Sequence, residues 1–342
     1  MRADYRSDTA TKLEKININL SLQGDDVYNE DLGTNQLQTK ISSFFGKEAG
    51  LFTPSGTMSN LIAILAYCNP GEEVIVGTQS HISLYEQGNA SRFGGVKMRN
   101  LTLNSDGEFD LQELESAMSN SDDIHMSKTS LICLENTNAD LGGKCLTIDY
   151  LRAVKAIADM HNCNVHVDGA RIWNAIVAMK QDPLDICSCF DSISVCLSKC
   201  YGAPIGNILA GDRAFYERSQ RLRKALGGGM RQTSIISQPA LGLFDDWERK
   251  MHISHEGCLE LYNRIGKIPQ MKILVKPQTN ILYVQYEHAT KLVQFVNDDA
   301  RFILSVPDKR GVIRIVAHHQ NAECAHALAD KINDYFVSVH EL

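Results

Sequence analysis

The sequence lacks the marks of several protein classes. Its 34 Lys and Arg stand against 41 Asp and Glu, and the resulting net charge of −7 leaves no basic surplus for a nucleic-acid surface. Every apolar stretch is shorter than a membrane span, and the first charges are not followed by the apolar core of a secretory signal. We therefore expect a cytoplasmic protein with neither a nucleic acid nor a membrane as partner.

The usual signatures of nucleotide and metal sites are also missing. Neither GxGxxG nor GxxxxGK(S/T) occurs, so a standard dinucleotide or ATP site has no motif. The ten cysteines are scattered, and the group of Cys187, Cys189, Cys196 and Cys200 has no paired CxxC knuckles. We interpret the cysteines as reduced, buried side chains and expect no metal site, with zinc at this group as the lesser alternative.

The 342 residues, 44% of them hydrophobic, are more than a single core usually covers, so we expect two domains. Strand-like and helix-like segments alternate from residue 130 to residue 211, which predicts an α/β domain with a mainly parallel sheet. After GGGMRQ (227–232) a long helical region covers 233–266, and strands then alternate with helices in a small α+β domain. We place the large domain at 1–245 and the small one at 246–342.

One candidate anion site lies at the start of a helix. LFTPSGTMSNLIAILAYC (51–68) runs from a strand-like piece through Ser55, Gly56 and Thr57 into an apolar helix. Free N–H groups and hydroxyls at such a start, together with the helix dipole, favour a phosphate. From this stretch alone, a simple N-cap by Ser55 or Thr57 is the commoner outcome.

A second candidate is Asp168 in VHVDGAR (165–171), which follows a strand-like pattern. Side chains alternate along a strand, so Val165 and Val167 face one side while His166 and Asp168 face the other. Asp168 then lies at the carboxyl end of a parallel strand, where open α/β sheets bind their ligands. A helix-capping aspartate fits the local sequence about equally well.

Lys199 in SVCLSKCYGAPIG (194–206) ends another buried strand, although lysine is normally a solvated surface residue. A helix start for a phosphate, an aspartate and a lysine together fit pyridoxal phosphate (PLP). The lysine forms a Schiff base with the cofactor aldehyde, and the aspartate pairs with the pyridinium nitrogen. Partial removal of Lys199 from water favours the neutral amine that this bond needs.

These motifs resemble the low-specificity L-threonine aldolases, PLP enzymes of fold type I with the aspartate aminotransferase fold. The resemblance covers about residues 6 to 320 in family order, and it implies a seven-stranded sheet in the large domain. The matching segments are RSDT (6–9), GDDVYNED (24–31), FGKEAGLFTPSGTMSN (45–60), SHISLYEQG (80–88), TSLICLENT (129–137), VHVDGARIWNA (165–175), DSISVCLSKCYGAPIG (191–206), GGGMRQ (227–232) and IRIVAH (313–318).

The resemblance implies which residues hold the cofactor. Lys199 would carry the Schiff base, Asp168 would pair with the pyridine nitrogen, and His81 would stack on the ring. The phosphate would be bound at the helix start by Ser55, Gly56 and Thr57. Lys224 and Arg231 match basic positions that reach a cofactor phosphate across a subunit interface, although a solvated helix face also explains Lys224.

The resemblance also implies how the substrate is bound. Ser7 and Arg314 would hold its carboxylate, Arg314 through a bidentate charge-assisted pair. Arg171 would lie near both the substrate and the cofactor's phenolic oxygen. His81 and His125 are the two candidates for the base that removes the β-hydroxyl proton. Without the resemblance, Arg314 would be interpreted as an edge-strand salt bridge and His81 as a surface histidine.

The implied reaction is the cleavage of L-threonine or L-allo-threonine, small amino acids, into glycine and acetaldehyde by a homo-oligomer. The family is usually tetrameric, with active sites shared at the dimer interface. Alternatives are another PLP reaction, such as β-elimination or racemisation, and a PLP-fold binding protein without catalysis; a metal-binding α/β hydrolase is more distant. The chain departs from the family at Asn138, at Cys200 and Tyr201, and in a short 287–312 segment.

Overall fold

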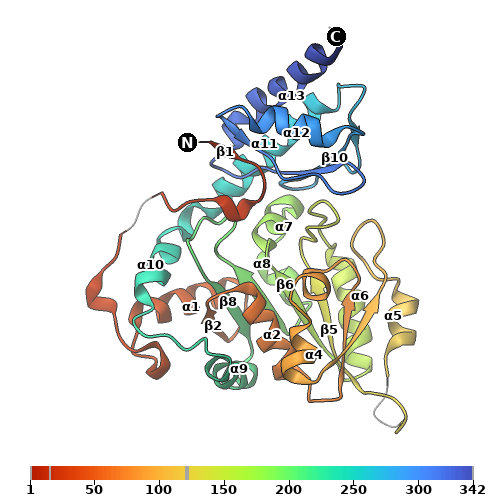
Figure 1. Ribbon diagram of the computed structural model, residues 1–342. Coiled ribbons are helices and arrows are strands. Elements are labelled where there is room, and N and C mark those ends of the chain that lie inside the picture. The colour runs from red at the N-terminus through yellow and green to blue at the C-terminus, as the bar shows by residue number, and fades with distance from the viewer. Residues whose placement is uncertain (1, 15–16, 120–122, 341–342) are drawn as a thin grey trace.

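The computed structural model describes residues 2–14, 17–119 and 123–340. Two units are visible in Figure 1: a large one around a central sheet, and a smaller one packed above it with both ends of the described chain. No helix of the described residues has the length and apolar character that a membrane crossing requires.

A seven-stranded sheet forms the centre of the large unit, with the order β2-β8-β7-β6-β5-β3-β4. Only β8 runs against its neighbours, so the mainly parallel sheet expected from the sequence is confirmed. Its strands are β2 (Ala49–Thr53), β3 (Glu73–Gly77), β4 (Lys97–Leu101), β5 (Thr129–Glu135), β6 (Asn164–Gly169), β7 (Ser192–Cys196) and β8 (Asn207–Gly211).

Helices cover both faces of this sheet, because residues of the inner strands are apolar on both sides. The helices of the large unit are α1 (Leu32–Phe44), α2 (Gly56–Tyr67), α3 (His81–Leu84), α4 (Asn89–Gly94), α5 (Leu111–Ala117), α6 (Ile148–Met160), α7 (Ile172–Met179), α8 (Pro183–Cys187), α9 (Arg213–Ala225) and α10 (Ser234–Gly242). Residues of α1, α6, α7 and α8 share one core with the sheet, whereas α2, α4 and α9 pack on the other face.

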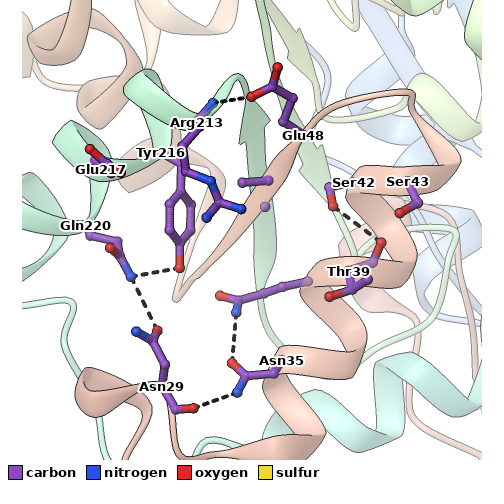
Figure 2. Close-up of a pocket in the computed structure, with 13 residues that line it drawn as sticks. Asn29, Asn35, Thr39, Ser42, Ser43, Glu48, Arg213, Tyr216, Glu217 and Gln220 are labelled. Carbon is purple, nitrogen blue, oxygen red and sulfur yellow. Dashed lines mark hydrogen bonds between the residues drawn. The ribbon is translucent and has the colours of Figure 1, made fainter.

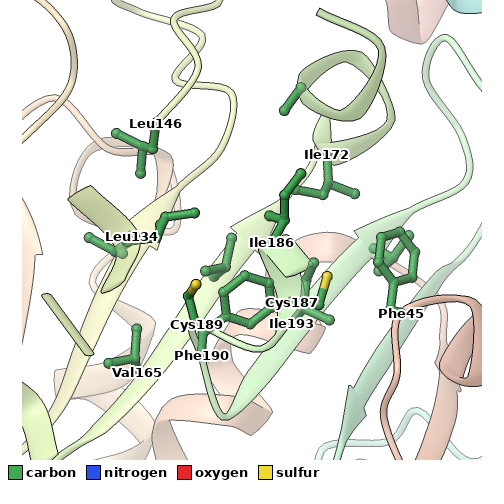
Figure 3. Close-up of a cluster of buried hydrophobic side chains, with 14 of the residues drawn as sticks. Phe45, Leu134, Leu146, Val165, Ile172, Ile186, Cys187, Cys189, Phe190 and Ile193 are labelled. Atoms are coloured by element: carbon green, nitrogen blue, oxygen red, sulfur yellow. The ribbon is translucent and has the colours of Figure 1, made fainter. Parts of the chain in front are cut away.

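The alternation along β6 follows the prediction. Val165 and Val167 lie in the core shared with α6 and α7, so His166 and Asp168 face α2. Figure 3 shows Val165 in this core together with Cys187 and Cys189, which pack as apolar side chains.

The small unit contains a three-stranded antiparallel sheet and a parallel pair of short strands. The sheet has the order β12-β10-β9, and the pair joins β1 to β11. The elements are β1 (Ala3–Asp4), β9 (Lys272–Ile273), β10 (Ile281–Gln285), β11 (Phe302–Ile303), β12 (Val312–Val316), α11 (Trp247–Ile265), α12 (Ala289–Asn297) and α13 (Ala325–His340).

The two units differ in detail from the expected ranges. The single helical region 233–266 is two helices, because α10 ends at Gly242 and α11 begins at Trp247. The N-terminal Tyr5 is buried in the small core, where its hydroxyl donates to the Asn321 carbonyl at 2.6 Å. α11 contributes Trp247 to the large core and Cys258 to the small one, so this helix spans both cores.

Candidate active site

The carboxyl ends of β5, β6 and β7 lie side by side, as parallel pairing requires. They bring Glu135, Asp168 and the segment that carries Lys199 to one edge of the sheet. A cavity of about 260 Å³ opens at this edge, with one wall from the small unit. It is lined by Ser7, Thr9, His81, Tyr85, Glu135, Ala139, Asp140, Arg171, Lys199 and Arg314.

The backbone of Lys199 is fixed from two directions. The Thr11 hydroxyl and the Gly202 N–H both donate to the Lys199 carbonyl, each at 2.9 Å. Gly202 has a φ of +96°, the left-handed region that favours glycine, and a Cβ there would approach Lys250 Nζ at 3.2 Å. Among the described residues, the ammonium of Lys199 has no hydrogen-bond partner, so it is available to a ligand in the cavity.

Asp168 lies behind the cavity and is almost fully buried. Its Oδ2 accepts a hydrogen bond from Asn60 Nδ2 at 2.9 Å, and its Oδ1 accepts one from the Ala170 N–H at 3.0 Å. His166 holds the other side of the Asn60 amide, with 3.3 Å between its Nε2 and Asn60 Oδ1. The carboxylate is therefore oriented from β6 and α2 at once, which the sequence did not reveal.

His81 begins α3 and lies in the cavity wall. Its Nδ1 donates to Glu86 Oε1 at 2.9 Å, and its backbone N–H donates to Glu135 Oε2 at 2.7 Å. The hydrogen bond to Glu86 raises the pKa of His81 above the usual 6.5. Burial, together with the Asp168 charge, raises the pKa of Glu135 to about 7.

Arg171 forms a buried, bidentate ion pair with Asp8. Its Nε donates to Asp8 Oδ2 at 2.8 Å and its Nη2 donates to Asp8 Oδ1 at 2.7 Å. Burial alone would raise the pKa of Asp8, but the Arg171 guanidinium outweighs it and holds this pKa well below its usual range. No local sequence pattern indicates the role of Asp8, although RSDT contains it, because its partner lies 163 residues away along the chain.

The departures at Cys200 and Tyr201 are accommodated without opening the site. The Cys200 thiol donates to Asp8 Oδ2 at 3.4 Å, and Asn280 Nδ2 contacts the same sulfur at 3.2 Å. The Tyr201 hydroxyl donates to the Ala240 carbonyl at 2.8 Å, away from the cavity. Cys200 thus joins the network that holds Arg171, whereas Tyr201 fills the core.

Ser7 and Arg314, the residues predicted to hold the substrate carboxylate, both line the cavity. Arg314 comes from β12 of the small unit, and its Nη2 donates to the Arg6 carbonyl at 3.2 Å. Ser7 begins the short 3₁₀ helix Asp8–Ala10, and its hydroxyl accepts the Thr9 N–H at 3.3 Å. Both groups reach the cavity because the N-terminal segment runs along the small unit.

The predicted phosphate site is the start of α2. The Ser55 hydroxyl accepts the Met58 N–H at 3.2 Å, so the N-cap alternative holds for this side chain. The N–H groups of Gly56 and Thr57 begin the helix and have no partner among the described residues. Ser55 and Thr57 line a second cavity of about 580 Å³, and Tyr85 lines both cavities.

His125, Lys224 and Arg231 are predicted site residues that line neither of these two cavities. His125 is exposed, bonds Asp123 at 3.1 Å and precedes the amino end of β5, at the opposite sheet edge. Lys224 is exposed at the end of α9, and Arg231 pairs with Asp25 at 3.0 Å. Roles for these side chains at a neighbouring subunit's site stay predictions.

Two further features are a polar cavity and a group of possible metal ligands, and we assign a ligand to neither of them. A polar cavity of about 430 Å³ between α1 and α9 (Figure 2) is lined by none of the described residues that we predicted as site residues. His81, Glu86 and Asp168 place ligand-type atoms within 4.8 Å of one another. Asn60 Nδ2 already donates to both carboxylates, at 2.8 and 2.9 Å, so we keep the prediction of a site without a metal.

Comparison with known proteins agrees with this geometry. A model of the beta-eliminating lyase family matches residues 4–289. The probable low-specificity L-threonine aldolase 2 of Arabidopsis thaliana is 39% identical over 93% of this chain and 92% of its own. The low specificity L-threonine aldolase of Escherichia coli K12 is 33% identical over 92% of this chain and 93% of its own. The chain belongs to the beta-eliminating lyase family, among the low-specificity L-threonine aldolases.

The fold of this aldolase agrees with that assignment. The solved threonine aldolase of Leishmania major superposes with a TM-score of 0.79, covering 97% of this chain and 99% of that one at 20% identity. At this identity the likeness establishes the fold, which is fold type I. The chemistry of this aldolase is therefore decided by the residues around its cavity and not by its fold.

Proposed function

We propose that this aldolase cleaves L-threonine and L-allo-threonine into glycine and acetaldehyde with pyridoxal phosphate as cofactor. The observation that carries the proposal is the convergence of Lys199, Asp168 and the two arginines Arg171 and Arg314 at one edge of the sheet. The free lysine matches the aldehyde of this cofactor, the buried aspartate matches its pyridine nitrogen, and the guanidinium groups match the carboxylate of an amino-acid substrate.

The donor set of this chain fits the cofactor. Lys199 has no competing partner, Asp168 is held buried, and the unpaired N–H groups of Gly56 and Thr57 suit a phosphate. Bound pyridoxal phosphate supplies an aldehyde for the substrate amine and a ring that stores the electron pair of the broken bond.

The chain's own residues orient the substrate. Arg314 and Ser7 bind its carboxylate from the small unit and the N-terminal segment, and Arg171 lines the same cavity. The bidentate pair with Asp8 keeps the Arg171 guanidinium charged and in a fixed plane. Fixing the carboxylate decides which bond at Cα is placed for cleavage.

The reaction also moves protons. The Cα–Cβ bond breaks as the β-hydroxyl proton passes to a base, which leaves acetaldehyde, and Cα takes up a proton to give glycine. His81, which lines the cavity, is the candidate base, and it acts in its neutral form. The carboxylate of Glu86 holds the imidazole in place through Nδ1, so Nε2 is the atom that is free to accept a proton.

The pH dependence tests the role of Glu86. Because the hydrogen bond to Glu86 raises the pKa of His81, neutral His81 forms only at a pH above the usual 6.5. We expect the acid limb of kcat/KM to lie above that pH and to move down in Glu86→Gln, which removes the charge. If the acid limb of kcat/KM lies at the same pH in wild type and in Glu86→Gln, this limb does not report the ionisation of His81. That result would exclude His81 as the base.

We further propose that the enzyme is a cytoplasmic homo-oligomer, a tetramer with active sites at dimer interfaces. The second cavity supports this, because Met58, Leu61, Phe93 and Leu226 give it apolar walls beside the proposed phosphate site. A second copy covering this cavity would bring its Lys224, Arg231 or His125 towards the neighbouring site.

Product analysis tests the proposed reaction. The purified protein with added pyridoxal phosphate is incubated with L-threonine, L-allo-threonine, L-serine and L-alanine in separate reactions. We expect equal amounts of glycine and acetaldehyde from the first two. Pyruvate and ammonia from L-serine would support β-elimination instead, and D-alanine from L-alanine would support racemisation.

A further inference from the structure

One buried carboxyl group in the catalytic cavity takes no part in the reaction described above. Glu135 is the last residue of β5, lines the cavity and is only 7% exposed. Its Oε2 accepts the His81 N–H at 2.7 Å, and its Oε1 accepts the Ala139 N–H at 3.0 Å. Both oxygens therefore bind the backbone, one at the start of α3 and one in the loop after β5.

The side chains around Glu135 do not supply it with a partner. Asp168 lies beside it in the register of β5 and β6, and the Arg171 guanidinium is already paired with Asp8. Among the described residues, no side chain forms a hydrogen bond or an ion pair with the Glu135 carboxyl, so the two backbone N–H groups are what holds it. The charged or titratable groups that face it are His81, Asp140, Asp168, Arg171, Lys199 and Arg314.

The helix that carries His81 does not fix this residue by itself. α3 has four residues, and a single helical turn is marginal on its own. The Ser80 hydroxyl caps it by accepting the Ser83 N–H at 3.3 Å, which leaves the His81 N–H to Glu135. Glu86 thus holds the ring of His81 and Glu135 holds its backbone, so two carboxylates together place the imidazole.

The hold on His81 depends on the ionisation of Glu135. A carboxylate offers an acceptor on each oxygen, whereas a proton on either oxygen turns that oxygen into a donor and weakens its contact with the N–H that faces it. Burial and the Asp168 charge raise the pKa of Glu135 to about 7. Glu135 therefore changes its protonation in the pH range in which His81 has to lose its own proton.

We propose that Glu135 is a positioning residue for His81, which holds the backbone of the base in place when it is ionised and releases it when it is protonated. The proposal rests on the proposed function, in which neutral His81 takes the β-hydroxyl proton. Glu135 acts through His81 and not on the substrate. Full activity then requires that two groups have lost their protons, the imidazole of His81 and the carboxyl of Glu135.

The first test compares the pH dependence of holoenzymes. The constants kcat and KM for L-threonine are measured against pH in wild type and in Glu135→Gln, which keeps the size of the side chain but does not titrate and turns an NH₂ group towards one of the two N–H groups. Glu72→Gln is the matched control. Glu72 Oε2 also accepts a backbone N–H, from Asn69 at 2.8 Å, but it lies at the amino end of β3, away from the cavity.

We expect the acid limb of log(kcat/KM) to be steeper by one unit in wild type and Glu72→Gln than in Glu135→Gln, because one proton fewer has to leave in that variant. Above both pKa values, kcat of Glu135→Gln should be about ten- to a hundredfold lower with KM close to wild type, the scale for a misplaced catalytic group. A lower rate at every pH with an unchanged slope would assign Glu135 a merely structural role and overturn the proposal.

A second test needs no turnover. Amide hydrogen exchange of the holoenzyme gives the protection of the peptide that contains His81, corrected for the intrinsic pH dependence of exchange, below and above pH 7. We expect this protection to fall below pH 7 in wild type and to be low on both sides in Glu135→Gln. Equal protection on both sides in wild type would overturn the proposal, even if the variant failed to fold. An enzyme that does not cleave L-threonine would refute the proposed function, while the exchange would still decide about Glu135.

Discussion

Lys199→Ala is expected to abolish both cofactor attachment and catalysis. Lys199 is the lysine that lines the cavity, and the Thr11 and Gly202 hydrogen bonds hold its backbone there. Without the amine, pyridoxal phosphate can be held only by non-covalent contacts, so the visible absorbance band of the lysine-bound cofactor should disappear. Turnover of L-threonine should fall below about a thousandth of wild type, because losing even one positioned proton-transfer group costs about 10²–10⁴-fold.

Lys199→Arg provides the matched control for this change. It keeps a positive charge near Asp8, whose pKa Lys199 helps to lower, and it cannot form the covalent bond. Loss of the band and of activity in both variants, with unfolding temperatures close to wild type, would assign the effect to the amine itself. An unchanged band in Lys199→Ala would place the cofactor on another lysine and contradict the site.

Asp8→Ala is expected to have the second large effect. It leaves the Arg171 guanidinium buried without its carboxylate, and breaking such a pair costs about 3–5 kcal/mol of unfolding free energy. Arg171 would also lose its fixed orientation in the cavity. We therefore expect a large fall in kcat/KM for L-threonine, with KM raised, together with a lower midpoint in urea unfolding.

Two further variants separate charge from packing at Asp8. Asp8→Leu combined with Arg171→Met removes both charges, and it should be more stable than Asp8→Ala although it stays inactive. Cys200→Ser keeps a donor to Asp8 and should change stability by no more than about 1 kcal/mol. If Asp8→Ala kept wild-type stability and KM, the positioning role of this ion pair would be wrong.

Much of the site could be predicted from local patterns, because its main residues end buried strands. Asp168 lies in β6, where alternation along the strand fixes the face of its side chain, and Lys199 lies in the turn after β7. Parallel strands bring such ends to one edge. The start of α2 could be predicted for a similar reason, because small residues before an apolar segment indicate a helix start in the local sequence. Chain order and periodicity thus specify the centre of the sheet and its ligand edge.

The rest depends on contacts between distant segments, which periodicity does not record. Asp8 finds Arg171, and Arg314 reaches the cavity from the small unit, only after both units have packed. Tyr5 belongs to the small core because a two-residue strand pairs with β11, and such a short strand leaves no pattern in the sequence. His125 was implied as a base only by the resemblance, and only the sheet topology shows that it lies at the opposite edge within its own chain.

Covalent trapping tests the central claim most directly. The holoenzyme is reduced with borohydride, which converts a lysine-bound cofactor into a stable amine, and the digested protein is examined by mass spectrometry. We predict a single phosphopyridoxyl group on the peptide that contains Lys199. A label on any other lysine, or no label on a protein that cleaves L-threonine, would contradict the assignment of this cavity as the active site.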